Sequence, residues 1–272
     1  MTLTLLNAPF GSNPGSFNFE RSGPAHVLYF EDSPRRVRVK LAGVTVADSR
    51  RMKLLHETGC IVVYYFHKDD IRGDLLVPSD HTSECPFKGT ARYWSVRVSD
   101  RVVENAVWAY DDPIDGAPDL ADYRAFYWNK MDAWFEEDEE VFGHARDPYH
   151  RIDVVPSSRH VKIRVGSEVV AETASPLILF ESSLPSRYYI PEEDVRADLL
   201  EKSDTTSVCP YKGTASYLSV RAGGELHRDV IWMYREPRLA VSKVEGHLCF
   251  FDEKVDVELD GELQEPPKTH WS

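Results

Sequence analysis

Two short stretches of the chain combine residue types that can do chemistry. One begins at Ser83 and reads SECPFKGTARYWSVR, and the other begins at Ser207 and reads SVCPYKGTASYLSVR. Each stretch places a thiol, an ammonium group and hydroxyl groups within a few residues. A neighbouring cation lowers the pKa of a thiol and so increases the nucleophilic thiolate fraction, whereas a lysine with a lowered pKa could form a Schiff base. The candidate catalytic residues are Cys85, Lys88, Cys209 and Lys212.

The two stretches belong to an internal repeat with an offset of 124 residues. With this offset, His26 aligns with His150 and Trp108 aligns with Trp232, without a gap between them. Between positions 79 and 97, 14 of 19 residues are identical in the two copies. The chain therefore consists of two copies of one domain, and the copies agree best at the Cys-Pro-x-Lys-Gly loop.

The loop also has a purely structural explanation. Proline restricts its own backbone and that of the preceding cysteine, and Gly89 and Gly213 permit the positive φ of a tight turn. In this explanation the cysteines are small apolar residues in the interior, and the lysines point to water. It does not explain why Ser83 and Lys88 are both kept in the second copy.

An obvious catalytic base is missing from the neighbourhood of the loop in sequence. The nearby histidines each face another residue type in the second copy: His56 faces Phe180, His67 faces Pro191 and His81 faces Thr205. This mismatch weakens the hypothesis of a cysteine nucleophile, because a nucleophile is usually activated by an adjacent base.

Aromatic residues form a second shared set. We expect either that they pack in the core or that they form the wall of a pocket beside the loop, with an aspartate or arginine fixing a small ligand. Arg72 and Asp74 would equally form a simple exposed ion pair. The candidate ligand-binding residues are Tyr65, Asp70, Arg72, Ser83, Tyr93, Trp108, Tyr110, Tyr189, Asp194, Arg196, Ser207, Tyr217, Trp232 and Tyr234.

Short strands must position these residues, because apolar and polar residues alternate over most of the chain. Hairpin turns are predicted at Ala42-Gly43 and at residues 166–167, and a short helix is predicted after Pro191. Each copy should close with a long strand, over residues 123–142 in the first copy. The acidic run 136–140 is interpreted as a solvated strand end. The fold class is therefore all-β with minor α, in two compact tandem domains.

The domain boundaries follow from the repeat and from Pro148 in the connection. We assign 1–23 to an N-terminal segment, 24–142 to the first β-domain, 143–153 to the linker, 147–264 to the second β-domain and 265–272 to a C-terminal tail.

Composition restricts the partners. A formal charge of −13 argues against binding to nucleic acid or to anionic membranes. The N-terminus has no basic residue before its short apolar patch, so we expect no secretory signal. Four separate cysteines without a Cys-x-x-Cys pair indicate reduced thiols, a cytoplasmic location and no zinc site. His144 and His150 with two nearby aspartates lack a third matched ligand, so no metal and no cofactor is predicted.

The motifs resemble those of the domain of unknown function 427 family. The matching segments are YYFHKDDIRGDLL, CPFKGTARY and AVWAYDDP in the first copy, and YYIPEEDVRADLL, CPYKGTASY and VIWMYREP in the second. The resemblance implies a β-tent architecture, similar in shape to zinc-binding modules such as methionine sulfoxide reductase B, but without the zinc site. A nucleotidyltransferase label used for some members finds no support here, since no glycine-rich phosphate loop and no paired Asp-x-Asp is present.

The sequence therefore leaves three functional hypotheses. The leading one is a tandem-domain protein in which each copy binds a small anionic or carbonyl-bearing molecule at its Cys-Pro-x-Lys-Gly loop, with cysteine- or lysine-dependent chemistry. The alternative is a non-catalytic interaction or scaffold protein in which the motif is a structural turn. Nucleotide handling is the third. Self-association is compatible with all three.

Overall fold

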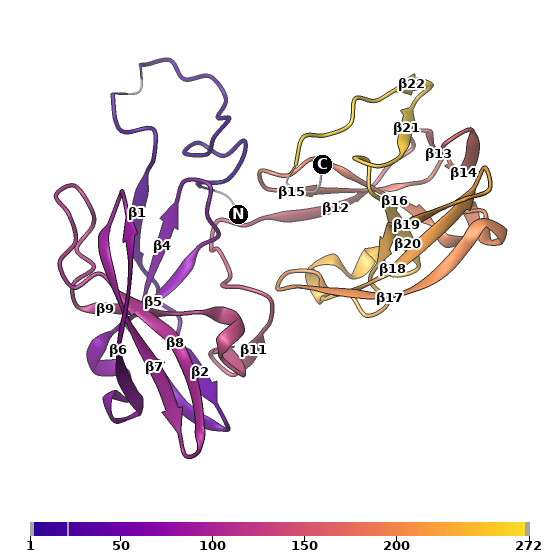
Figure 1. Cartoon of the computed structure of the whole chain (residues 1–272). Helices are drawn as coiled ribbons and strands as arrows, with labels where there is room; N and C mark the ends of the chain where they lie inside the picture. The colour runs from indigo at the N-terminus through magenta and orange to yellow at the C-terminus, as the bar shows by residue number, and fades with distance from the viewer. Residues whose placement is uncertain (1–2, 21, 270–272) are drawn as a thin grey trace. The chain divides into compact units, whose positions relative to one another are not determined.

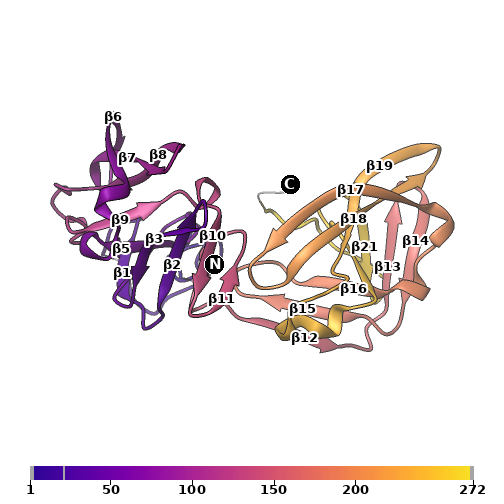
Figure 2. The same ribbon diagram turned by 90° about the horizontal axis from the view of Figure 1, so that it is seen from below.

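The computed structural model describes residues 3–20 and 22–269. The chain divides into two units, Met1–Tyr149 and His150–Ser272. Each unit contains one seven-stranded and one four-stranded sheet, and all strand pairs are antiparallel (Figures 1 and 2). The prediction of an all-β chain with two tandem domains is confirmed, whereas the β-tent comparison stays a prediction.

The strand order is the same in both units. The large sheet of the first unit has the order β1 (Leu28–Asp32), β4 (Lys53–Glu57), β5 (Val63–His67), β9 (Tyr123–Phe126), β8 (Arg101–Ala109), β7 (Gly89–Val98), β6 (Leu76–Cys85). Its small sheet has the order β11 (Glu139–Val141), β10 (Ala133–Glu136), β2 (Val37–Leu41), β3 (Val44–Ser49).

The second unit repeats this arrangement. Its large sheet has the order β12 (Ile152–Pro156), β15 (Leu177–Glu181), β16 (Arg187–Pro191), β20 (His247–Phe250), β19 (Glu225–Met233), β18 (Gly213–Ala222), β17 (Leu200–Cys209). Its small sheet has the order β14 (Glu168–Thr173), β13 (Val161–Val165), β21 (Asp256–Leu259), β22 (Glu262–Leu263). Figure 1 shows the long strands β17 and β18 side by side, as their pairing requires.

Helical structure in the described residues is limited to short 3₁₀ turns. They are η1 (Lys68–Asp70), η2 (Gly73–Leu75), η3 (Trp128–Lys130), η4 (Glu192–Asp194), η5 (Ala197–Leu199) and η6 (Leu239–Val244). The helix predicted after Pro191 is therefore the single turn η4.

The predicted hairpins are present. Ala42 and Gly43 both have positive φ, at 48° and 76°, and join β2 to β3, which is the backbone of a two-residue hairpin turn. The predicted closing strand is wrong, because β9 pairs in the large sheet and β10 in the small one, with η3 between them. Part of the acidic run is also not solvated. Glu136 is buried, and it accepts hydrogen bonds from Arg35 and from the Tyr64 hydroxyl.

Apolar residues occupy both faces of the large sheet, which explains why several strands do not alternate cleanly. In β5, Tyr64 and Phe66 pack in the core between the two sheets, while Tyr65 packs on the opposite face. That opposite face is closed in the first unit by a segment that includes Leu120, which is completely buried. In the second unit η6 closes it. The Cys-Pro-x-Lys-Gly loops lie on this opposite face.

Candidate functional site

The loop of each unit is a three-residue connection between two long strands. Cys85 and Gly89 are partners across the hairpin of β6 and β7, and Cys209 and Gly213 are partners in β17 and β18. The two glycines have φ values of 98° and 106°. A side chain at Gly213 would place a Cβ atom 3.2 Å from the carbonyl oxygen of Glu236. The turn therefore requires glycine for steric reasons.

The lysines of the loop do not point to water. The Lys88 ammonium donates to the Glu57 carboxylate, and the Lys212 ammonium donates to the Glu181 carboxylate. The side chain of Lys88 is only 8 % exposed. The expectation from the turn-only explanation is thus wrong on this point, and the glutamates at the ends of β4 and β15 are site residues that sequence reasoning missed.

A histidine completes the assembly in each unit. Nε2 of His26 lies 3.0 Å from Oε1 of Glu57, and its ring stacks on Phe87 with centroids 3.6 Å apart. In the second unit, Nε2 of His150 lies 3.1 Å from Glu181 Oε1, and the ring stacks on the equivalent aromatic residue of the loop with centroids 3.7 Å apart.

A matched histidine, which seemed to be missing, is therefore present at the loop in both units. In each unit this histidine precedes the loop cysteine by about 60 residues in the chain. The signal was available, because the offset that aligns the loops also aligns the two histidines and the two glutamates.

In the second of these His–Glu–Lys assemblies, the pKa of the glutamate is strongly shifted. Burial alone would raise the pKa of the Glu181 carboxyl. The attraction of Lys212 and the hydrogen bonds from His150 and Lys212 outweigh this effect and lower the pKa from 4.5 to about 2. The carboxylate therefore remains ionised at any physiological pH, and it is the fixed centre to which the loop lysine and the histidine attach.

The aromatic candidates of the first unit lie together beside the loop. The half-buried thiol of Cys85 packs against one cluster with Tyr65, Tyr93, Trp108 and Tyr110. Burial is the main cause that raises the pKa of Tyr110, and the nearby Tyr65 and Cys85 add to the rise. The tyrosine hydroxyl is therefore a neutral donor next to the thiol.

The second unit repeats this cluster with Tyr189, Tyr217, Trp232 and Tyr234. Trp232 Nε1 donates to the Tyr189 hydroxyl at 3.2 Å. The hydroxyl pair between serine and tyrosine is also repeated, with Ser83 2.8 Å from Tyr93 and Ser207 2.7 Å from Tyr217.

Four of the candidate ligand-binding residues lie elsewhere. Arg72 forms a two-point ion pair with Asp74, and Arg196 does the same with Asp198. Asp70 accepts hydrogen bonds from Ser49 and Arg51. Bridges from residues 71 and 195 to the small sheets hold these segments against β3 and β14. The structure does not bring Asp70, Arg72, Asp194 or Arg196 to the loop.

Metal-ligating side chains do not gather anywhere in the described ranges. Residues 3–20 and 22–269 contain no group of three or more His, Cys, Asp or Glu side chains that could hold a metal ion. In the same part of the chain, none of the helical segments has the length and apolar character needed to cross a bilayer.

The comparisons with known proteins agree with the repeat. A family model described as a domain of unknown function (DUF427) matches residues 29–137 and again residues 153–261. A search of curated proteins found no match. Because the two matched regions cover most of the chain, the protein belongs to the DUF427 family and contains two copies of its domain in tandem.

Proposed function

We propose that each domain binds a small anionic or carbonyl-bearing molecule at the Cys-Pro-x-Lys-Gly loop, with the loop thiol as the reacting group. The observation that supports this most is the duplicated His–Glu–Lys assembly at the loops that carry Cys85 and Cys209. A purely structural turn would need its proline and glycine, but it would not need a buried cation, a carboxylate and a histidine at the loop.

Each group of the assembly has a distinct part in the proposal. The glutamate fixes the lysine and the histidine, and the lysine provides a positive charge at the loop. Because a Schiff base requires a free amine and both ammonium groups are paired with carboxylates, the lysines fit electrostatic stabilisation better than nucleophilic attack. The histidine is the candidate base for the thiol proton.

The reaction with a carbonyl compound would be a reversible addition. The thiol proton passes to the base, and the thiolate sulfur forms a bond with the carbonyl carbon. The π electron pair of the carbonyl group moves to its oxygen, which then takes up a proton to give a hemithioacetal. Lys88 or Lys212, together with the neutral hydroxyl of Tyr110 or Tyr234, would stabilise the charge on that oxygen.

Thiol reactivity as a function of pH tests this proposal. The measurement uses the full chain with Cys60→Ser, because Cys60 is exposed, whereas the completely buried Cys249 should stay silent. Comparing Cys85→Ala with Cys209→Ala assigns the two signals. We expect Cys85 and Cys209 to be labelled in the folded protein. Lys88→Met should change the labelling rate of Cys85 and leave that of Cys209 unchanged.

The second candidate function is that of a non-catalytic interaction or scaffold protein. It is favoured by the close fit of the loop, since a Cβ atom added at Gly213 would lie 3.2 Å from a backbone oxygen and both lysines are already paired. If Cys85 and Cys209 react only after unfolding, this candidate replaces the first one.

A further inference from the structure

The two units differ in the part of the core next to equivalent tyrosines of β5 and β16. In the first unit, two indole rings fill this place. Trp128 and Trp134 stack with centroids 4.4 Å apart and planes 5° apart, and Tyr64 lies 6.1 Å from each ring. Trp134 Nε1 also donates to the carbonyl oxygen of Trp128 at 3.1 Å.

Both tryptophans are replaced by smaller residues in the second unit. Asp252 stands 124 residues after Trp128. Val257 takes the place of Trp134. Trp134 of β10 pairs with Val39 of β2, and Val257 of β21 pairs with Ile163, the equivalent residue of β13. Tyr188, the counterpart of Tyr64, is kept. The second unit has therefore exchanged two large aromatic side chains for a carboxylate and a valine.

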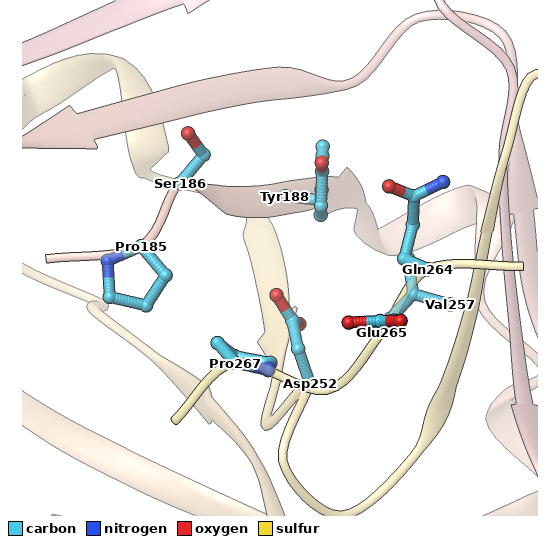
Figure 3. A pocket seen from close by; sticks show the side chains of 8 residues that line it. All are labelled: Pro185, Ser186, Tyr188, Asp252, Val257, Gln264, Glu265 and Pro267. Atoms are coloured by element: carbon cyan, nitrogen blue, oxygen red, sulfur yellow. The ribbon is translucent and has the colours of Figure 1, made fainter. Parts of the chain in front are cut away.

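A cavity of about 220 Å³ lies at this place in the second unit (Figure 3). In Figure 3 the Asp252 carboxyl points into the space below Tyr188, with Glu265 and Gln264 on one side and Pro185 on the other. The volume lies just below the range of roughly 300–1,000 Å³ that is usual for drug-sized ligands, so a ligand here would be small. The residues that line the cavity are Pro185, Ser186, Tyr188, Asp252, Val257, Gln264, Glu265 and Pro267.

The charges around the cavity do not balance. Arg187 donates to both carboxylate oxygens of Glu253, at 2.9 and 2.6 Å, while its Nη1 lies 3.5 Å from Asp252 Oδ2. One arginine therefore faces two acidic groups. Asp252 is only 8 % exposed, and burying a carboxylate that shares its one cation with a second carboxylate is costly. Burial raises the pKa of Asp252, Arg187 lowers it and Glu253 raises it again, to about 7.

We propose that this cavity of the second unit is a binding site for a small organic ammonium ion. The ammonium group would supply a second positive charge for the two carboxylates that share Arg187, and the ring of Tyr188 offers a face for a cation or for the carbon frame of the ligand. Glu265 at the rim adds to the negative potential. The site is independent of the function proposed for the loops and does not involve Cys85 or Cys209.

Calorimetric titration of the full chain with benzylammonium at about pH 8 tests the proposal, because most of Asp252 is ionised there. Benzyl alcohol, which has the same shape without the charge, is the matched neutral probe. We expect one saturable benzylammonium site per chain and at least tenfold weaker binding of benzyl alcohol. Two equivalent sites per chain, equal affinity for both probes or no saturable binding of benzylammonium would overturn the proposal.

Two variants locate the site. Asp252→Asn should weaken benzylammonium binding at least tenfold, while Asp256→Asn removes the same charge from an exposed position and should leave binding unchanged. Val257→Trp restores one indole of the first unit and should block binding by filling the cavity. Thermal unfolding of each variant shows whether it is folded. Undiminished binding by folded Asp252→Asn would contradict the proposal.

Discussion

The Lys212 ammonium contacts the Glu181 carboxylate across 31 residues of chain, with side chains 14 % and 5 % exposed. The equivalent pair of Lys88 and Glu57 is formed in the first unit. The fold fixes both partners of this ion pair, because Glu181 ends a strand of the large sheet and Lys212 belongs to a hairpin loop. Its energetic and chemical consequences can be tested separately.

Removal of one partner should destabilise the unit strongly. Glu181→Gln leaves the Lys212 ammonium buried beside a neutral amide, and breaking a buried pair in this way costs about 3–5 kcal/mol of unfolding free energy. The double substitution Glu181→Leu with Lys212→Met removes both charges and should cost clearly less. Urea unfolding of the full chain measures both. If the single and double variants were equally destabilised, the pair would not be the cause.

Acidification should act on the same carboxylate. The pKa of Glu181 falls from its ordinary 4.5 to about 2 in the folded unit, so the unfolded chain takes up a proton first. The stabilisation is complete above about pH 4.5 and is lost as the pH falls towards 2, by roughly 3 kcal/mol in all.

The measurement is the difference in unfolding free energy between the wild type and Glu181→Gln from neutral to acidic pH. This difference should shrink over that window. A difference that stayed constant down to about pH 2 would show that the carboxylate does not have the lowered pKa.

The loop glycine should not tolerate a side chain. Gly213→Ala combines a φ of 106° with a Cβ atom 3.2 Å from the Glu236 carbonyl oxygen, and we expect a loss of about 1–3 kcal/mol. Gly166→Asn is the matched control, because Gly166 has a φ of 59° with no atom within 4 Å of its Cβ position, and asparagine accepts the left-handed region. Equal effects of the two substitutions would show that the crowding at Gly213 is not important.

The local sequence pattern was sufficient to predict turns and the two faces of individual strands. The turn at Ala42-Gly43 follows from a glycine between two alternating segments, and the alternation of Tyr64 and Tyr65 places them on opposite faces of a strand. The long closing strand could not be excluded in this way, because the break between β9 and β10 depends on a change of sheet at η3.

The candidate site was predictable only in part. The loop, its cysteine and the tyrosines near it were identified from the repeat, but the burial of Lys88 was not, because its partner Glu57 comes from another strand. Alignment of the two copies does match the glutamates and the histidines, so a search for charged residues kept in both copies would have found them. The replacement of Trp128 by Asp252 did not predict a cavity, because the residues that line the cavity around Asp252 are known only from the structure.

Asp252 should make the stability of the second unit depend on pH in the opposite direction to Glu181. Its folded pKa of about 7 lies above the ordinary 3.8, so the folded unit holds a proton that the unfolded chain releases. The contribution of Asp252 to the unfolding free energy is therefore greatest below about pH 4 and falls as the pH rises to about 7, by up to roughly 4 kcal/mol at 1.36 kcal/mol per pKa unit.

The variant Asp252→Asn cannot ionise and should lose this slope, which unfolding measured from about pH 4 to 8 would reveal. The neutral side chain should also make the variant more stable than the wild type at about pH 8, since Arg187 then has only the Glu253 carboxylate to neutralise. Saturating benzylammonium should reduce the slope of the wild type between about pH 4 and 7, because the bound cation stabilises the ionised carboxylate of the folded unit, and it should leave Asp252→Asn unaffected. If the slopes of the wild type and Asp252→Asn were the same, another group would be responsible for the titration.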